Sequence, residues 1–313
     1  MNILITGING FVGSNFVKSW KDKHTLYGLD INQTPQESVE KIISWEELNK
    51  LPKVDVIVHL AGKAHDTKNR SEAESYFQIN TELTKVIFDY FLESDAKTFV
   101  FFSSVKAAAD TVPGDILTEN IIPNPIGPYG KSKIKAEEYI LSKQLTVDSL
   151  QKRVFILRPC MIHGPGNKGN LNLLYSVVSK GIPWPLGAFD NKRSFCSIEN
   201  ISYVVEQIIV NENIIGDIYH VGDDEPLSTN ELIKLISESV NKKSRIWNLP
   251  KGLMNDLASL GSVIRLPLNK ERLNKLTENY VVSNAKIKKA LGIERMPVSA
   301  VDGLRKTIES FST

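Results

Sequence analysis

The chain has 313 residues, 42% of them hydrophobic, so it can bury one large core or one core with a smaller second lobe. Its 38 basic and 36 acidic residues give a formal net charge of +2, a balance that argues against a nucleic-acid-binding protein with a basic stripe. The two cysteines are far apart, the N-terminal segment lacks a basic leader with a cleavage site, and no apolar run approaches the ~20 residues that span a bilayer, so we expect a cytoplasmic protein without a structural metal or a membrane segment.

The first half of the chain alternates short apolar runs with amphipathic stretches. The apolar runs are continuous in Val, Ile, Leu and Phe, which is typical of strands that are covered on both faces. This alternation predicts an α/β fold with a Rossmann-type doubly wound parallel sheet and right-handed crossovers. We predict strands at residues 2–6, 25–30, 55–61, 98–103 and 154–158, and helices at 11–21, 72–93 and 130–144.

The first strand runs directly into a glycine-rich turn. Gly7, Gly10 and Gly13 suit a tight turn, a close approach of the backbone to a pyrophosphate, and close packing of helix against strand. The amides at the start of the next helix would point at the phosphates. An ordinary strand-to-helix turn is the alternative for this G-x-x-G-x-x-G spacing, but its place between the first strand and the first helix favours dinucleotide binding.

A carboxylate closes the second strand. Asp30 stands where an acid can accept hydrogen bonds from both ribose hydroxyls of a dinucleotide and would repel a 2′-phosphate. Ile31 follows it and no arginine stands beside it, so the sequence favours NAD over NADP as the cofactor. The alternative is that Asp30 merely begins a turn.

Tyr129 and Lys133 lie one helical turn apart at the start of the third predicted helix, so they share one face of it. A free phenol titrates near pH ~10, too high for a base at neutral pH, but a neighbouring ammonium favours the phenolate. Lys133 can thus activate Tyr129 and also hold the nicotinamide ribose. Ser104, at the carboxyl end of the fourth strand, can bridge the phenol and a substrate oxygen. A Tyr-x-x-x-Lys pair often arises by chance, and its combination with the glycine turn and this serine is what indicates catalysis.

After residue 158, glycine and proline interrupt the sequence heavily and the pattern becomes mostly helical. We therefore expect an NAD-binding domain over residues 1–159 and a smaller substrate lobe over 160–313, with segments from about 193–221 able to return to the first domain. The helices predicted in this half are residues 171–180, 199–211, 229–240 and 298–311.

Taken together, these motifs resemble the extended short-chain dehydrogenases and, within them, the NAD-dependent epimerase/dehydratase family. The resemblance covers nearly the whole chain and implies that Ser104, Tyr129 and Lys133 are catalytic. Its motifs are residues 6–13 (TGINGFVG), 55–62 (DVIVHLAG), 102–104 (FSS), 128–133 (PYGKSK), 157–159 (LRP) and 164–166 (GPG). The cofactor contacts that it implies are Gly7, Gly10, Phe11, Val12, Gly13, Asp30, Ile31, Leu60, Ala61, Gly62, Asn80, Ser103, Tyr129, Lys133 and Pro159.

The resemblance also implies substrate contacts. Besides Ser104, it points to Asn170 and Leu171, at a helix start that suits a diphosphate. Arg193 matches an arginine whose planar fork would clamp the diphosphate, and Arg272 is a candidate second clamp. For each of these residues, a solvated charge or an ordinary loop is the alternative.

The segment after the strand-end serine limits which of the family's reactions the chain can catalyse. The family's 4,6-dehydratases carry Thr-Asp-Glu there, because removing water needs an extra acid and base, whereas this chain has Ser104, Val105 and Lys106. The leading hypothesis is NAD-dependent 4-epimerisation of a UDP-hexose or UDP-N-acetylhexosamine through a transient 4-keto sugar. The alternatives are NAD(P)H-dependent C4 reduction of a UDP-4-keto-6-deoxy-N-acetylhexosamine, and a non-catalytic dinucleotide sensor. By the same resemblance we expect a homodimer formed through the helices at residues 72–93 and 130–144.

Overall fold

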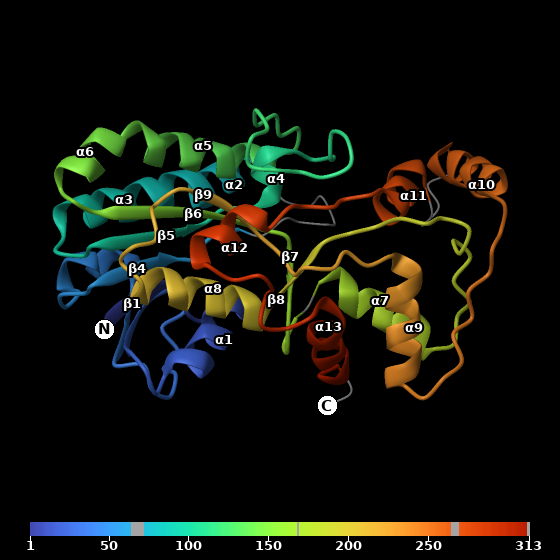
Figure 1. The fold of residues 1–313 in the computed structure, drawn as a ribbon, viewed down its shortest axis with the longest axis horizontal. Coiled ribbons are helices and arrows are strands. Elements are labelled where there is room, and N and C mark those ends of the chain that lie inside the picture. Colours follow the sequence, from blue (N-terminus) through green and yellow to red (C-terminus); the bar gives the residue numbers. More distant parts are fainter. Residues whose placement is uncertain (64–71, 168, 264–268, 312–313) are drawn as a thin grey trace.

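The computed structural model describes residues 1–63, 72–167, 169–263 and 269–311. At its centre, seven parallel strands form one sheet in the order β3-β2-β1-β4-β5-β6-β9 (Figure 1). The chain builds outward from β1 in both directions, so the strand order reverses between β1 and β4, the place where ligands bind in open sheets of this type. The strands are β1 (Asn2–Thr6), β2 (Thr25–Leu29), β3 (Lys41–Ile43), β4 (Val56–His59), β5 (Thr98–Phe102), β6 (Arg153–Pro159) and β9 (Ile218–Val221).

Helices cover both faces of this sheet, which confirms the predicted Rossmann-type fold. On one face lie α2 (Ala73–Phe77), the π-helical turn η2 (Gln78–Glu82), α3 (Leu83–Glu93), α5 (Pro128–Ser142) and α6 (Gln144–Ser149) (Figure 1). The other face carries α1 (Phe11–Trp20), α8 (Ile198–Val210) and α12 (Ala285–Leu291). Two further short helices, η1 (Trp45–Lys50) and α4 (Val105–Ala108), follow β3 and β5.

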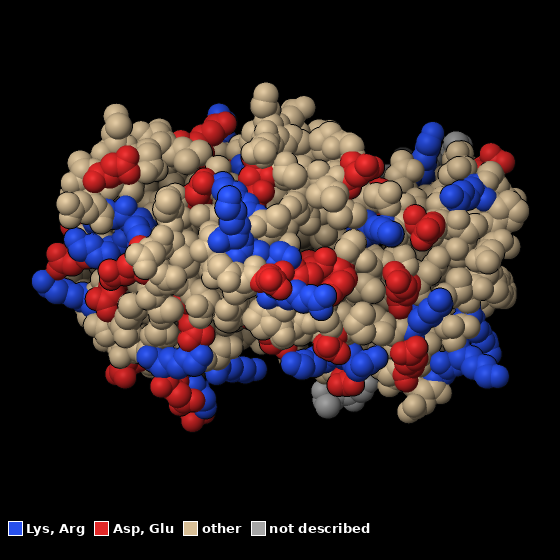
Figure 2. Space-filling model, in the orientation of Figure 1, with Lys and Arg blue, Asp and Glu red and all other residues tan. Residues whose placement is uncertain are grey.

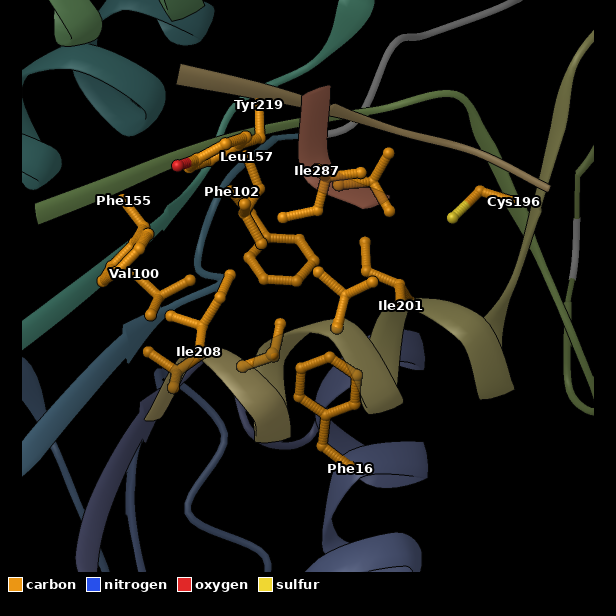
Figure 3. Close-up of a cluster of buried hydrophobic side chains, with 14 of the residues drawn as sticks. Phe16, Val100, Phe102, Phe155, Leu157, Cys196, Ile201, Ile208, Tyr219 and Ile287 are labelled. Atoms are coloured by element: carbon orange, nitrogen blue, oxygen red, sulfur yellow. The ribbon is translucent and has the colours of Figure 1, made fainter. Parts of the chain in front are cut away.

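The strand β5 shows how one apolar run serves two cores. Its side chains alternate between the faces of the sheet, as they must in any strand. Phe99 and Phe101 pack toward α3 and α5, whereas Val100 and Phe102 join the cluster against α1 and α8 (Figure 3). Burying a side chain of this size stabilises the fold by about 1.5–3 kcal/mol. Because both faces of β5 are covered, all five of its residues can be buried in this way.

The remaining elements form a second lobe with a core of its own. The strands β7 (Met161–His163) and β8 (Phe195–Ser197) pair in parallel beside the main sheet. Buried residues such as Leu171, Trp184 and Leu304 hold the surrounding helices together. These helices are α7 (Asn170–Ser179), α9 (Thr229–Ser239), α10 (Lys251–Val263), α11 (Lys270–Thr277) and α13 (Ala300–Glu309).

The two lobes are interleaved in the sequence. After β7, α7 and β8, the chain returns to the main sheet as α8 and β9, and β9 pairs with β6 through a register that places His220 opposite Arg158. It then leaves for α9, α10 and α11, returns once more as α12, and ends in the second lobe with α13. The edge strand of the first lobe, β9, therefore comes later in the sequence than β7, α7 and β8 of the second lobe.

The surface gives little indication of a macromolecular partner on the face seen in Figure 2. Basic and acidic side chains are interspersed there, in keeping with the formal net charge of +2. None of the helices in the described part of the chain has the length and apolarity needed to cross a membrane.

Candidate active site

The glycine turn between β1 and α1 is closed so tightly that side chains are excluded. Gly7 adopts a φ of +70°, and a Cβ added to it would lie 2.9 Å from the backbone of Ala61. At Gly13 an added Cβ would lie 2.5 Å from the carbonyl oxygen of Ile8. These contacts bring the start of α1 against both the turn and the loop after β4, and they leave the backbone of the turn open to a close ligand.

Asp30 lies directly after β2 and spans the same turn. Its Oδ2 accepts from the backbone N–H of Asn9 at 2.9 Å, and its Oδ1 accepts from that of Asn32 at 2.9 Å. Each carboxylate oxygen has a second lone pair, so both ribose hydroxyls of a dinucleotide can still be accepted. The side chain of Ile31, in contrast, is exposed.

A buried hydrogen-bond chain fixes the loop after β4. Thr6 Oγ1 accepts from the N–H of Ala61 at 3.1 Å, which leaves its hydroxyl proton for His59 Nδ1 at 2.7 Å. His59 Nε2 therefore carries the ring proton and donates it to Thr84 Oγ1 at 2.9 Å, whose own proton goes to the carbonyl of Asn80. Burial holds the pKa of His59 well below its usual value, in agreement with a neutral ring. His59 is thus a satisfied core histidine that positions its neighbours.

Asn80 connects this loop to the helix that carries the tyrosine. Its Oδ1 accepts from the N–H of Lys63 at 2.7 Å, and its Nδ2 donates to the Lys63 carbonyl at 3.1 Å and to Ser132 Oγ at 3.0 Å. Ser132 Oγ in turn donates to the carbonyl of Tyr129 at 2.8 Å. Asn80 lies in the π-helical turn η2, a local widening that is frequent at functional sites.

The three predicted catalytic residues lie together at the carboxyl edge of the sheet. Ser104 caps α4 directly after β5, and its side chain is hydrogen bonded to the phenol of Tyr129 on α5. Lys133 Nζ donates to the carbonyl of Phe102 at 2.7 Å and lies 3.2 Å from the point where a Cβ on Gly62 would stand. A side chain at Gly62 would thus compete with the ammonium for space.

The charges of this site are controlled mainly by burial. Burial raises the pKa of the Tyr129 phenol, and the hydrogen bond to Ser104 opposes that shift. Burial also lowers the pKa of Lys133 to about 8, while the carboxylate of Glu137 acts in the opposite direction. Both groups are therefore pushed toward their neutral forms.

Ser103 has a different setting from its neighbour. Its hydroxyl donates to Glu137, which also accepts from Arg158 Nε at 3.0 Å, and all three side chains are buried. The hydroxyl therefore faces the interior of the sheet–helix layer, and a contact with a cofactor would come from the backbone. The other predicted cofactor residues lie around the same edge: Phe11 and Val12 begin α1, Leu60, Ala61 and Gly62 follow β4, and Pro159 ends β6.

The second lobe brings one predicted substrate residue into a polar setting. Arg193 donates from Nη2 to Glu278 Oε1 at 3.1 Å, while its buried Nε–H finds no acceptor among the described residues. Leu171 is buried in the core of this lobe, so only its backbone can face a ligand. The side chains of Asn170 and Arg272 lie outside the described residues.

Sequence reasoning missed two aromatic neighbours of the site. The ring of Tyr76 on α2 packs edge-on against Tyr129, with centroids 6.1 Å apart. Tyr280 donates its hydroxyl to the carbonyl of Ala109, the residue after α4, at 2.6 Å. Neither residue belongs to a motif, and their positions follow only from the packing of distant segments.

The residues present fit a bound dinucleotide. Three features lie together where the strand order reverses. They are the glycines at which a Cβ would clash, the start of the helix that follows them, and a carboxylate that still has lone pairs to accept hydrogen bonds. Among the described residues, no group of His, Cys, Asp or Glu side chains is arranged to hold a metal ion.

Comparisons with known proteins agree with this geometry. Residues 3–222 match the model of the NAD dependent epimerase/dehydratase family. A UDP-glucose 4-epimerase of Vibrio cholerae is 29% identical, over 99% of this chain and 95% of that protein. The N-acetyl-alpha-D-glucosaminyl-diphospho-ditrans,octacis-undecaprenol 4-epimerase of Escherichia coli O157:H7 is 27% identical, over 92% and 85% of the two chains. Among solved structures, MoeE5 in complex with UDP-glucuronic acid and NAD superposes with a TM-score of 0.77 over 100% of this chain and 99% of that one, and its 18% identity establishes likeness of fold.

Proposed function

Since this chain belongs to the NAD-dependent epimerase/dehydratase family, we propose that it is a 4-epimerase of a UDP-hexose or UDP-N-acetylhexosamine, acting through a transient 4-keto sugar. The observation that carries the proposal is the cluster of Ser104, Tyr129 and Lys133 beside a glycine turn that fits a dinucleotide. The Vibrio cholerae and Escherichia coli relatives, both named as 4-epimerases, support it.

Proton transfer is the part of the reaction that this chain's own residues perform. Tyr129 accepts the proton of the sugar's 4-hydroxyl, and Ser104 holds the phenol and the substrate oxygen in line. When bound, NAD supplies the hydride acceptor, and its oxidised ring adds positive charge that favours the phenolate. Lys133 adds a second positive charge and, through its bond to the Phe102 carbonyl, is already fixed at the edge of the sheet. For C4 to be inverted, the 4-keto sugar must present its other face, and Tyr129 then returns the proton to the 4-oxygen as the alcohol re-forms.

The substrate's diphosphate would be held by the second lobe. The Nε–H of Arg193, which has no acceptor in the described part of the chain, and the start of α7 supply donors of the right kind. Since Arg193 is already bonded to Glu278, a diphosphate must compete with that carboxylate for the guanidinium.

The direct test is conversion without added cofactor. The purified protein, incubated with UDP-glucose, UDP-galactose, UDP-N-acetylglucosamine and UDP-N-acetylgalactosamine in turn, should convert at least one pair, as followed by NMR of the sugar protons. An epimerase returns its hydride, so turnover should continue with no added NAD or NADH. A protein that converts none of the four would lack the proposed activity.

The competing function is a C4 ketoreductase, and a more distant relative favours it: the GDP-6-deoxy-D-mannose reductase of Pseudomonas aeruginosa, 23% identical over 75% of this chain. A reductase would consume added NADH only in the presence of a 4-keto sugar and would leave the four UDP-sugars unchanged. A dinucleotide sensor would bind NAD and do neither.

A homodimer is the proposed assembly. Apolar side chains at Ile79, Val86 and Leu141 are exposed on η2, α3 and α5, the elements expected to pair. Covering them in a second copy would remove apolar surface from water. Light scattering should give twice the mass of one 35.0 kDa chain, and a purely monomeric sample would contradict the proposal.

A further inference from the structure

Lys106 lies beside the catalytic cluster, at the end of the segment in which this chain lacks the acidic residues of the dehydratases. It follows Ser104 by two residues, and its backbone N–H donates to the Ser104 hydroxyl at 3.2 Å. Its carbonyl packs against Gly130, the residue after Tyr129, where an added Cβ would lie only 2.3 Å away. The backbone of Lys106 is therefore fixed between the serine and the tyrosine.

The side chain of Lys106 extends from there toward the second lobe. Its Nζ lies 4.3 Å from the centroid of the Tyr280 ring, and Tyr280 is bridged through its backbone to Arg193. The charges that act on the Lys106 ammonium include those of Glu278 and Arg193. The residue is thus close both to the serine of the catalytic cluster and to the arginine proposed to hold the diphosphate. A hexose whose C4 faced Tyr129 and whose diphosphate faced Arg193 would pass near this ammonium.

The ammonium of Lys106 has donors to spare. It donates to the carbonyl of Asp110 at 2.6 Å, and within the described residues no carboxylate forms an ion pair with it. An ammonium has three N–H donors, so the remainder are open to an acceptor. Burial lowers the pKa of Lys106, while the carboxylates of Glu278 and Asp110 act in the opposite direction.

We infer that Lys106 is a specificity-determining residue that donates hydrogen bonds to an oxygen of the hexose bound between Tyr129 and Arg193. The inference rests on the proposed function. It adds a contact to the sugar itself, whereas the diphosphate is left to Arg193.

Lys152 provides a matched control. Its Nζ also donates to backbone carbonyls, those of Phe91 and Ser94, and it lies 4.5 Å from the centroid of the Phe91 ring. Burial lowers its pKa as well. Because it stands directly before β6, at the amino end of the sheet, the variant Lys152→Met tests the loss of a buried lysine without touching the site.

The experiment compares UDP with UDP-sugars as probes. Full-length wild type, Lys106→Met, Lys106→Gln and Lys152→Met are titrated with UDP and with the four UDP-sugars by calorimetry, and kcat and KM are measured for whichever pair is converted. Lys106→Met should bind UDP within about two-fold of wild type but lose about 10–100-fold in affinity or kcat/KM for the UDP-sugar. Lys106→Gln, which keeps two N–H donors, should recover part of that loss, and Lys152→Met should show none.

Two results would overturn the inference. If Lys106→Met weakened UDP and UDP-sugar by the same factor, the lysine would bind the diphosphate, and if it weakened neither, the lysine would be structural. Failure of the proposed function has a different signature, because wild type would then convert no UDP-sugar. In that case, equal binding of the UDP-sugars by wild type and Lys106→Met would overturn the inference by itself.

Discussion

Burial acts on the two ionisable side chains of the candidate active site in opposite directions. It raises the pKa of the Tyr129 phenol and lowers that of the Lys133 ammonium to about 8. The phenol therefore keeps its proton at neutral pH unless further positive charge stands beside it. The sequence predicts that the ammonium one turn away favours the phenolate, whereas burial, the largest influence on the pKa of Tyr129, acts in the opposite direction.

Removing the phenol should stop the reaction without emptying the cofactor site. Tyr129→Phe is expected to lower turnover by about 10²–10⁴-fold, because a general base of this kind contributes that much. NAD affinity should stay within several-fold, since the glycine turn and Asp30 are untouched. NMR turnover and NAD titration check the two halves of the prediction, and a variant that still turned over would remove Tyr129 from the role.

Lys133 should lower the free energy of unfolding, although the reaction needs it. Its pKa lies below the ordinary 10.5, so below pH 8 the folded state keeps a buried charge that the unfolded state holds in water, and this penalty fades as pH rises from 8 to 10.5. Lys133→Met should therefore unfold about 2–5 °C higher than wild type at pH 7, and the difference should shrink by pH 9.5.

Thermal scans across that pH range test the sign of this effect. The exposed Lys131→Met on the same helix is the control and should show no pH-dependent difference from wild type. A Lys133→Met variant less stable than wild type at pH 7, or a gap that widened with pH, would contradict the prediction.

At the scale of elements, the sequence predicted most of the first lobe and three helices of the second, α7, α9 and α13, but not α10 and α11. Five strands were predicted within two residues of their bounds, because long apolar runs between turn signals are distinctive. The strands β3, β7 and β8 have three residues each, too few for an apolar pattern to stand out. The helix predicted at 72–93 is in fact interrupted by the π-helical turn η2. The turn keeps the amphipathic pattern of the segment, so the sequence indicated one continuous helix.

The site was predicted to a similar degree. Sequence motifs gave the glycine turn, Asp30 and the serine–tyrosine–lysine cluster, which the structure brings to one edge of the sheet. Tyr280 and Lys106 could not be assigned, because their meeting depends on a segment far along the chain that packs under α4.

The turn before α1 should tolerate no side chain at its third glycine. Gly13→Ala is expected to lose NAD binding and to destabilise the protein, since its Cβ would overlap the Ile8 carbonyl and neither backbone segment can give way. Gly252 on α10 is the matched control: it has open space around it, so Gly252→Ala should stabilise by about 0.5–1 kcal/mol. Denaturant unfolding and NAD titration report on both variants.

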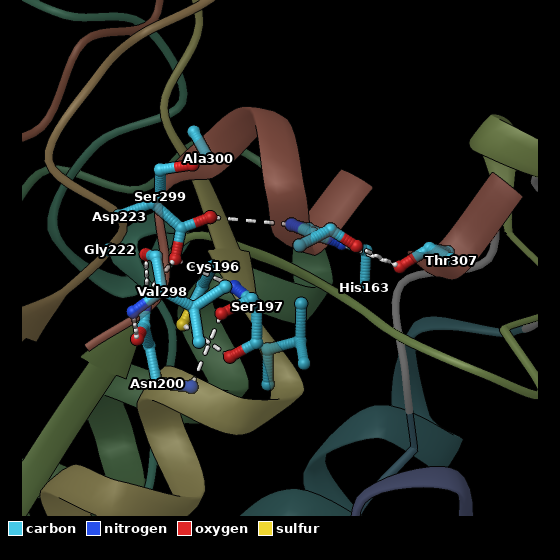
Figure 4. Close-up of polar contacts among 12 residues, drawn as sticks. His163, Cys196, Ser197, Asn200, Gly222, Asp223, Val298, Ser299, Ala300 and Thr307 are labelled. Carbon is cyan, nitrogen blue, oxygen red and sulfur yellow. Dashed lines mark hydrogen bonds and ion pairs between the residues drawn. The ribbon is translucent and has the colours of Figure 1, made fainter. Parts of the chain in front are cut away.

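At the scale of the whole molecule, a buried polar cluster joins the lobes (Figure 4). Asp223, which follows β9, accepts from the Ser197 N–H at 2.9 Å and from Asn200 Nδ2 at 2.7 Å, and it faces His163 Nε2 at 3.3 Å. His163 Nδ1 reaches Thr307 on α13 at 2.9 Å. His163 belongs to no sequence motif, because its partners Asp223 and Thr307 lie far along the chain.

Breaking this cluster should lower the stability of both lobes together, because they share it. Asn200→Ala removes one of the donors to Asp223 and the partner of both backbone groups of Val298, so we expect a loss of about 1–3 kcal/mol or more in the free energy of unfolding. The exposed Asn213→Ala should change it by less than about 0.5 kcal/mol. Urea unfolding that showed two separate transitions for wild type would argue against a shared cooperative core.

The late arrival of β9 also bears on how the protein is made. A ribosome releases β6 well before residues 218–221, so during synthesis the growing sheet ends in a strand whose outer hydrogen-bonding groups have no partner. A nascent chain that stalled in this interval would expose a template for association with its neighbours. For the same reason, gene fragments that stop at residue 159 should yield aggregates. Because the lobes are interleaved in the sequence, grafting the second lobe of a relative would require several junctions.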